Sequence, residues 1–189
     1  MTESDDAVAR SVLGNQDGYE DLYRRHGAGA LRTALAILGD LQLAEEARQE
    51  AFLQAFRTLS RKRPEVAFSS WLYRCVVWAA RTQDARRRRR PQAASVDPGG
   101  TEDLDRVEVR LQLVAAMQEL PIELREVLTL RFYLDLPVEE VAQIQRCSAG
   151  TVKSRCARAL ARLRDSGHLA GFAPPVKAFG EQCNVQTRI

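Results

Sequence analysis

A short segment near the middle of the chain interrupts an otherwise helical sequence pattern. Residues 91–105, PQAASVDPGGTEDLD, are rich in Pro, Gly, Ser and Asp and show no apolar periodicity, which is the composition of a linker. On both sides of it, apolar residues recur at the three- to four-residue spacing of amphipathic helices. No segment gives a convincing strand pattern. The sequence therefore predicts an all-α chain, with two small helical domains joined by a flexible acidic linker.

The distribution of charge supports this division. The domain before the linker carries 16 basic and 12 acidic residues, whereas the linker carries four acidic residues and no basic one. From residue 106 to residue 164 there are ten basic and seven acidic residues. Two basic domains on either side of an acidic segment indicate two contacts with one polyanion. The expected boundaries are 1–90 for the first domain, 91–104 for the linker, 105–165 for the second domain and 166–189 for a tail, disordered or loosely docked.

About four helices are expected on each side of the linker. In the first domain the periodicity predicts helices over Glu20–Gly39, with a break at Gly27 and Gly29, over Leu43–Leu59, and over Phe68–Arg90. Ser69 or Ser70 is a plausible cap for the last of these. In the second domain it predicts a helix over Leu104–Leu120 and further helices that begin at Pro121, Pro137 and Ser148.

Several classes of protein lack support in the sequence. The acidic N-terminus, MTESDDAVAR, has no apolar segment of a signal peptide, so we expect a cytoplasmic protein. The four cysteines are scattered, without the C-x-x-C pair or the nearby His of a zinc site, and are expected to be reduced. A helical carboxylate-metal enzyme would need a Glu-x-x-His partner, which Glu45, Glu46 and Glu50 lack. We therefore expect no catalysis, no metal and no cofactor.

The segment Val141–Arg164 contains six basic residues and no acidic one. On a helical wheel its last helix places Val152, Cys156, Ala159 and Leu163 on an inward stripe, and small residues alternate with cations on the opposite ridge. Such a ridge can approach DNA closely and contact phosphates and base edges. With the preceding short helix and the turn at residues 146–148, it predicts a helix-turn-helix whose second helix enters the major groove.

Both halves of the sequence resemble a known family. LPIELREVLTLRFYLDLPVEEVAQIQRCSAGTVKSRCARALARLR looks like the C-terminal helix-turn-helix domain of group-four, extracytoplasmic-function RNA polymerase sigma factors of the sigma-70 family. YEDLYRRHGAGALRTALAILGDLQLAEEARQEAFLQAF, followed by FSSWLYRCVVWAARTQDARRRRR, resembles that family's promoter-melting domain. The resemblance covers about residues 18–164 in the expected order. It implies a bacterial, nucleoid-associated sigma factor that binds core RNA polymerase and directs transcription initiation from promoters with −10 and −35 elements.

The family's polymerase-binding helix matches Gly39–Phe56. The resemblance implies that its polar ridge meets a coiled coil of the largest polymerase subunit, and that the second domain meets the flap region. Many relatives are held by an anti-sigma factor, but the sequence shows no sign of whether one exists here. The ridge residues expected to bind polymerase are Glu45, Glu46, Gln49, Glu50 and Gln54.

The helix that matches the family's −10 element reader combines aromatic and basic residues. Aromatic side chains can stack on unpaired bases while cations follow the backbone. Trp71 and Leu72 are expected in the core. Trp78 stands where the family usually has Asn, and Thr82 replaces a frequent Asp, so the preferred −10 sequence is open. The expected −10 contacts are Arg74, Trp78, Arg81, Arg86 and Arg87.

The resemblance also assigns −35 contacts on the last helix. Arg155 lies nearer the inward stripe than Arg158, which suits either a phosphate contact or an intradomain pair. Arg146 occupies the turn, where Gly is common, and suggests an adjusted turn or one extra phosphate contact. The expected −35 residues are Ser148, Thr151, Lys153, Ser154, Arg155 and Arg158. The alternative is a stand-alone helix-turn-helix regulator, which would leave the acidic ridge and the aromatic–arginine helix unexplained.

Overall fold

The computed structural model describes residues 16–59, 67–89 and 112–166 of the 189-residue chain. Within these ranges no strand occurs, and the all-α prediction is confirmed. The N-terminal half comprises α2 (Gln16–Leu38), α3 (Leu41–Leu59) and α4 (Phe68–Arg89). The C-terminal half comprises a helical segment at 112–118, α6 (Ile122–Leu128), the π-helix η1 (Thr129–Tyr133), α7 (Val138–Gln145) and α8 (Ala149–Asp165). The expected linker at 91–104 and the tail beyond residue 166 lie outside the described residues.

Aromatic contacts pack the first two helices against each other. The ring of Tyr19 lies 4.7 Å from that of Phe56, and the ring of Tyr23 lies 4.8 Å from that of Phe52, centroid to centroid. Such tilted pairs add to the free energy gained by burying apolar area. The apolar stripes of α2, α3 and α4 are buried against one another, as the periodicity predicted. Trp71 is half-buried and packs on this core, beside the fully buried Leu72.

The turn between α2 and α3 depends on Gly39 and Asp40. Gly39 has φ +65°, a left-handed conformation in which glycine ends a helix at little cost. A Cβ atom there would also lie 2.5 Å from Nε2 of Gln118, so the C-terminal half approaches this turn closely. Asp40 Oδ1 accepts a hydrogen bond from the Leu43 backbone N–H at 3.0 Å and caps α3.

Two expectations about the N-terminal half are wrong. The helix does not break at Gly27 and Gly29, because α2 continues through both positions to Leu38. Gly27 is buried beneath Tyr23, so tertiary packing offsets the helix-interior cost of glycine, about 1 kcal/mol. Nor do Ser69 and Ser70 cap α4, because the buried Phe68 already begins that helix and places both serines in its first turn.

The C-terminal half departs from a continuous helix after residue 128. The Leu134 backbone N–H donates to Thr129 O and the Leu136 N–H donates to Leu130 O, which closes wider turns than an α-helix has. Asp135 follows with φ 51°, and the chain then enters α7 at Pro137. The expected helix from Pro121 therefore ends in a π-helical turn that redirects the chain toward the helix-turn-helix.

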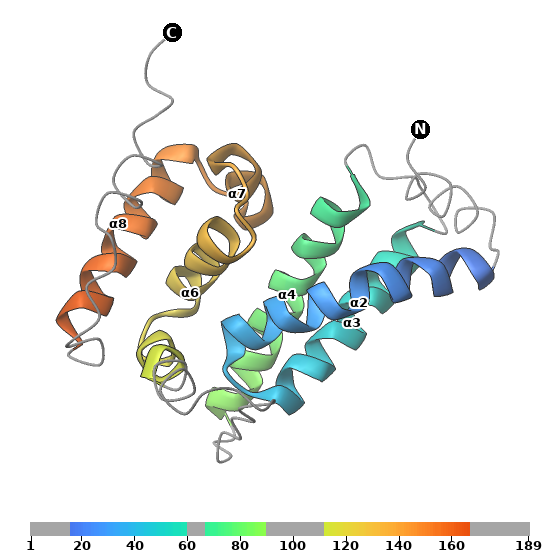
Figure 1. Ribbon diagram of the computed structural model, residues 1–189, viewed down its shortest axis with the longest axis horizontal. Helices are drawn as coiled ribbons and strands as arrows, with labels where there is room; N and C mark the ends of the chain where they lie inside the picture. Colours follow the sequence, from blue (N-terminus) through green and yellow to red (C-terminus); the bar gives the residue numbers. More distant parts are fainter. Residues whose placement is uncertain (1–15, 60–66, 90–111, 167–189) are drawn as a thin grey trace, which may run out of the picture.

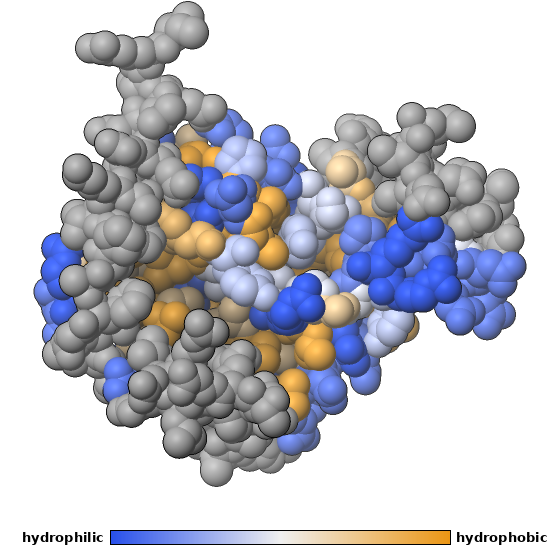
Figure 2. Space-filling model, in the orientation of Figure 1, coloured by the Kyte–Doolittle hydropathy of each residue, from blue (hydrophilic) through white to orange (hydrophobic). Residues whose placement is uncertain are grey.

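The two halves lie side by side, with α4 of the first half facing α6 and α7 of the second (Figure 1). Helices α2 and α3 lie on the far side of α4 from α8, which forms the opposite edge of the molecule (Figure 1). In the same view, hydrophilic side chains cover the outer end of α2, while apolar side chains reach the surface nearer the middle of the molecule (Figure 2). The two helices expected to read DNA are therefore in different positions: α8 is at an edge and α4 is at the centre.

Candidate nucleic-acid interface

The helix-turn-helix consists of α7, a short turn and α8. Helix α7 ends at Arg146, whose φ of 53° is left-handed and whose backbone N–H points back to the α7 carbonyls. The Ser148 side chain then accepts a hydrogen bond from the Thr151 backbone N–H at 3.1 Å and caps α8. Both features agree with the turn and cap that the sequence predicted. Arg146 keeps the glycine-like conformation with an exposed cationic side chain, so the turn is not rebuilt.

Most of the predicted −35 residues lie on the outer face of α8. Its inward stripe is Val152, Cys156, Ala159 and Leu163, all buried, as predicted. Lys153, Ser154 and Arg158 are exposed, whereas Thr151 is half-buried and its hydroxyl lies 2.9 Å from that of Ser148.

Arg155 differs from its neighbours on α8. Its Nη1 donates to Gln145 Oε1 at 3.0 Å and contacts Cys147 Sγ at 3.7 Å. Of the two roles expected for Arg155, the structure shows the intradomain pair. This contact ties α8 to the end of α7.

The predicted polymerase ridge is a continuous surface on α3. Glu45, Glu46, Gln49 and Gln54 are exposed and Glu50 is half-buried, opposite the buried Ala44, Ala47, Ala51 and Ala55. Leu53 was not predicted here, yet it is 50% exposed. At about 100° per residue it lies between Glu46 and Gln49 on the helical wheel, in the middle of the ridge. An exposed leucine surrounded by polar residues could have marked this position in the sequence.

The predicted −10 residues all lie on α4, but they have different surroundings. Trp78 is 48% exposed and Arg86 is also exposed, so both can meet a ligand. Arg74 donates to Gln143 Oε1 of α7 at 3.2 Å, and Arg81 forms an ion pair with Glu126 of α6. Arg87 donates to Leu38 O at 3.1 Å and to Gln118 Oε1 at 3.3 Å. Three of the five residues are thus held by other parts of the protein.

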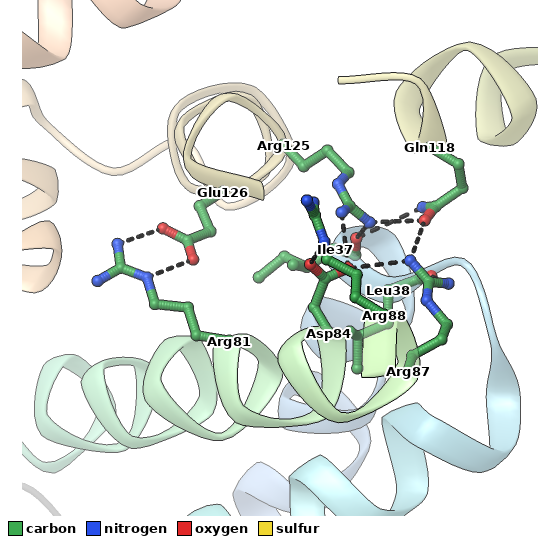
Figure 3. Close-up of polar contacts among 9 residues, drawn as sticks. All are labelled: Ile37, Leu38, Arg81, Asp84, Arg87, Arg88, Gln118, Arg125 and Glu126. Carbon is green, nitrogen blue, oxygen red and sulfur yellow. Dashed lines mark hydrogen bonds and ion pairs between the residues drawn. The ribbon is translucent and has the colours of Figure 1, made fainter. Parts of the chain in front are cut away.

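A buried guanidinium connects the two halves (Figure 3). Arg125 of α6 has a side chain 1% exposed, and its Nη2 lies 2.8 Å from Asp84 Oδ1 of α4. Its Nη1 donates to Ile37 O at 2.8 Å, at the end of α2, and to Gln118 Oε1 at 2.6 Å. A cation at the C-terminus of a helix is favourable because it meets the negative end of the helix dipole.

The neighbouring residue, Glu126, makes a second connection. Arg81 Nε donates to Glu126 Oε1 at 2.7 Å and Arg81 Nη2 to Oε2 at 2.6 Å, a bidentate pair. Figure 3 shows Arg125 and Glu126 extending from α6 toward α4. On its other side Glu126 Oε2 accepts from Gln145 Nε2 at 3.0 Å. Because Gln145 also accepts from Arg155, polar contacts run continuously from α4 to α8.

The two buried carboxyl groups respond differently to their surroundings. Burial would raise the pKa of Asp84, but hydrogen bonds and charge from Arg125 and Arg88 outweigh it and hold that pKa below its ordinary value. Burial raises the pKa of Glu126, and Arg81 and Gln145 offset the rise only in part. Glu126 is therefore the more costly charge to keep buried.

Sequence reasoning missed Asp84, Gln118, Arg125 and Glu126. In an amphipathic pattern a charged residue is ordinarily assigned to the solvent face, so the adjacent charges within Leu124–Leu128 gave no indication of burial. The sequence signal that could have indicated their burial is the pair of opposite charges, Arg125 and Glu126, between apolar neighbours. Their partners lie 41 and 45 residues away in the chain, and no local pattern could identify them.

Comparison with known families identifies both halves. Residues 22–91 match the family Sigma-70 region 2, and residues 110–163 match the family Sigma-70, region 4. The first match spans α2 to α4, and the second spans the helix-turn-helix. A basic helix-turn-helix joined to a separate helical region is the class of protein that these two matches define: a transcription initiation factor.

Curated relatives agree with both matches. RNA polymerase sigma-H factor of Pseudomonas aeruginosa is 31% identical over 168 residues, covering 80% of this chain and 87% of the relative. ECF RNA polymerase sigma factor SigM of Mycobacterium tuberculosis is 33% identical over 157 residues, covering 82% of this chain and 80% of the relative. ECF RNA polymerase sigma-E factor of Escherichia coli K12 is 32% identical over 170 residues, covering 80% of this chain and 87% of the relative. The chain belongs to the ECF sigma factors of the sigma-70 family, which direct promoter-specific transcription.

Solved structures share the fold. CnrH, determined in complex with the cytosolic domain of CnrY, matches with a TM-score of 0.65 at 22% identity, covering 85% of this chain and 94% of that one. RpoE of Bartonella quintana, determined in complex with the anti-sigma factor NepR, matches with a TM-score of 0.66 at 21% identity, covering 84% of this chain and 99% of that one.

The described residues also bear on two other kinds of site. Among residues 16–59, 67–89 and 112–166, no group of three or more His, Cys, Asp or Glu side chains is placed to hold a metal ion. In the same part of the chain, no helix has the length and apolar character needed to span a membrane.

The buried Asp84–Arg125 pair generates a prediction about stability. Asp84→Asn removes the charge that compensates a fully buried guanidinium, so it should lower the free energy of unfolding by about 3–5 kcal/mol. Arg88→Ala removes only the 62%-exposed partner of the same carboxylate and should cost less than about 1 kcal/mol. Urea unfolding followed by circular dichroism measures both values. Equal losses for the two variants would show that Arg125 does not depend on Asp84.

Proposed function

We propose that this sigma factor divides its work among three helices. Helix α3 binds core RNA polymerase, α4 contacts the −10 element and α8 contacts the −35 element. The observation that carries the proposal is the presence of both sigma-70 regions, in order, on one chain whose three helices present different chemistry. They present an acidic ridge, an aromatic–arginine helix and a cationic helix-turn-helix. We place the domains at 1–90 and 105–165, with the linker at 91–104 between them and 166–189 as a tail to which no role is assigned.

The ridge of α3 suits a protein partner rather than DNA. Its exposed acidic residues would repel phosphates, and they can pair with basic groups on the largest polymerase subunit. Leu53 adds apolar area in the middle of the ridge. An apolar centre with a polar rim is the usual anatomy of a protein–protein interface.

Helix α4 suits unpaired promoter DNA. The half-exposed indole of Trp78, in the middle of α4, provides a face on which a base can stack, and Arg86 is exposed two turns further along the helix. Base–aromatic stacking combined with cationic backbone contacts is how proteins hold single strands. On the helical wheel Arg74 and Arg81 lie within about 60° of Trp78 and belong to the same surface once their present partners release them. Arg87, also expected at the −10 element, lies about 180° from Trp78 on the other side of the helix.

Helix α8 suits the major groove of duplex DNA. Lys153, Ser154 and Arg158 are exposed on its outer face, and Ser148 and Thr151 lie at its N-terminus, where a recognition helix contacts bases. Arg155 positions the helix through Gln145, and Arg146 offers a phosphate contact from the turn. In this proposal the factor selects the promoter and the catalysis belongs to the polymerase.

The remaining partners and the location follow from the same role. The factor works in the bacterial cytoplasm, at the nucleoid, because its substrate complex is polymerase on promoter DNA. The flap region of polymerase is the expected contact of the C-terminal half. An anti-sigma factor remains a prediction for this chain. A stand-alone regulator is less favoured, since it gives no use for the α3 ridge.

The polymerase contact is tested by reversing charge on the ridge. Glu46→Lys with Glu50→Lys should weaken binding to core polymerase at least tenfold, because like charges across an interface cost several kcal/mol. The control is Asp17→Lys with Glu20→Lys, which makes the same change in net charge at the outer end of α2. Affinity is measured by fluorescence anisotropy of the labelled factor, with helicity checked by circular dichroism. If both double variants bind polymerase equally well, the ridge is not the polymerase contact.

The −35 contact is tested by separating two arginines of α8. Arg158→Ala should cost about 1–3 kcal/mol at a preferred −35 sequence and should flatten discrimination there. Arg162→Ala, further along the helix, should lower affinity about equally on every sequence and reduce the salt slope by roughly 0.9 per lost phosphate contact. The measurement is binding of the polymerase holoenzyme to promoter variants across a salt series. Uniform loss on Arg158→Ala, with preference unchanged, would make α8 a phosphate clamp only.

A further inference from the structure

We propose that Arg146 anchors the helix-turn-helix to a phosphate of the duplex DNA backbone beside the −35 bases, and that it takes the phosphate role that Arg155 does not perform. The inference rests on the proposed −35 role of α8. It divides two cations of the motif into one that binds DNA and one that positions the recognition helix.

The backbone at Arg146 has the form that normally selects glycine. The Cys147 backbone N–H donates to Ala142 O at 2.9 Å, and the Arg146 N–H donates to Gln143 O at 3.4 Å. These two hydrogen bonds form the Schellman motif that ends a helix, and they require a left-handed residue, here Arg146 with φ 53° and ψ 50°. Glycine adopts this conformation at no steric cost, because it has no Cβ atom.

An arginine at this position needs a reason outside the turn. In the described ranges, only Asp135 and Arg146 are non-glycine residues with a positive φ. Aspartate visits this conformation more readily than most residues, because its short polar side chain can hydrogen-bond locally. Arginine has no such local compensation, and residues held in sparsely populated conformations cluster at sites that bind ligands. The long cationic side chain is therefore the part of Arg146 that the protein uses.

The Arg146 side chain is placed to meet a ligand. It is exposed, and no residue in the part of the chain that the structure describes forms a hydrogen bond or an ion pair with its guanidinium. Arg146 stands two residues before Ser148, the cap of α8. In a helix-turn-helix the first helix crosses the DNA backbone, and the second enters the major groove by its N-terminal residues. The turn between them lies where the chain passes the phosphates.

The residues on either side of Arg146 engage Arg155 within the protein. Gln145 Oε1 accepts from Arg155 Nη1 at 3.0 Å, and Cys147 Sγ lies 3.7 Å from the same nitrogen. Arg155 is half-buried in this position. The chain thus turns two neighbouring side chains inward to one arginine and presents the other arginine to solvent between them.

The orientation of the Gln145 amide makes this division firm. Gln145 is 4% exposed, and its Nε2 donates to Glu123 O at 3.1 Å and to Glu126 Oε2 at 3.0 Å. A backbone carbonyl and an ionised carboxylate only accept hydrogen bonds, so the amide nitrogen faces them and the amide oxygen faces Arg155. The partner of Arg155 is therefore fixed by α6, independently of DNA.

A phosphate contact from the turn has a sequence-independent effect on binding. Phosphates carry no base information, so Arg146 raises the affinity for every −35 sequence by about the same factor. Neutralising one phosphate also releases counterions, which adds roughly 0.9 to the magnitude of the salt slope on duplex DNA. A side chain that reads bases, the role proposed for Arg158, changes the ranking of sequences instead.

Three substitutions separate the charge of Arg146 from its backbone conformation. Arg146→Gly removes the charge and the strain, Arg146→Asn removes the charge but tolerates the left-handed conformation, and Arg146→Lys keeps the charge. Binding of the polymerase holoenzyme to duplex promoter variants is measured across a salt series. The glycine and asparagine variants should bind about fivefold more weakly on every −35 sequence, with the salt slope reduced by roughly 0.9. Arg146→Lys should bind within about twofold of the original chain.

Two further variants and an unfolding measurement serve as controls. Arg24→Asn removes the same charge from α2, on a side chain 78% exposed in the other half of the protein, and should leave DNA binding within about twofold. Arg155→Met removes the positioning contact and should leave the salt slope within about 0.3 of its original value. The urea midpoint of Arg146→Gly should be equal to or above that of the original chain, because glycine releases the left-handed strain.

Each competing explanation has its own result. If the glycine and asparagine variants of Arg146 bind DNA like Arg24→Asn, there is no phosphate contact and the proposal is overturned. If they lower the urea midpoint and leave the salt slope unchanged, Arg146 only stabilises the end of α7, which also overturns it. A reduced salt slope for Arg155→Met, with none for Arg146→Asn, would reverse the two roles.

Arg158→Ala keeps failure of the anchor apart from failure of the proposed −35 function. If Arg158→Ala flattens −35 discrimination while the Arg146 variants have no effect, α8 still reads the −35 element and only the anchor is rejected. If Arg158→Ala leaves discrimination unchanged while Arg146→Asn lowers the salt slope, base reading through Arg158 is rejected and the anchor stands.

Discussion

The position of α6 against the N-terminal half depends on one buried guanidinium. Arg125 reaches the Asp84 carboxylate on α4, the Ile37 carbonyl near the end of α2 and the Gln118 side-chain amide, each within 2.8 Å. A buried charge without these partners would cost several kcal/mol, so packing arrangements that separate them are disfavoured. The pair thereby fixes how the two halves meet. The helix-turn-helix follows, because α6 supports α8 and α7 follows α6 through the π-helical turn.

This arrangement gives α4 two competing sets of partners. Its cations are those that a sigma factor would present to promoter DNA, yet Arg74, Arg81 and Arg87 are paired within the protein. Trp78 and Arg86, by contrast, stay exposed. The α3 ridge is exposed as well, so this arrangement leaves the proposed polymerase surface accessible.

Local sequence patterns were sufficient for the helices and for the parts of the site that lie on one helix. The inward stripe of α8, its Ser148 cap and the exposed α3 ridge all follow from spacing and from residue type. The helix break at Gly27 and Gly29 was wrong because tertiary packing overrides an unfavourable propensity. The Arg125 and Glu126 contacts could not be predicted, since a charged residue can be buried only when a distant partner is present, and periodicity contains no information about that partner.

The distance between the two halves tests the account most directly. Nitroxide labels at Ala28→Cys on α2 and Ala161→Cys on α8, both exposed, report it by pulsed electron resonance in a Cys147→Ser, Cys183→Ser chain. In the free factor, where the two halves lie side by side, the account predicts one short distance between the two labels. In the complex with polymerase and promoter DNA, a longer distance should replace it, by an increase on the order of tens of ångströms, since the elements lie more than two DNA turns apart. The same short distance in a transcribing complex would contradict the account.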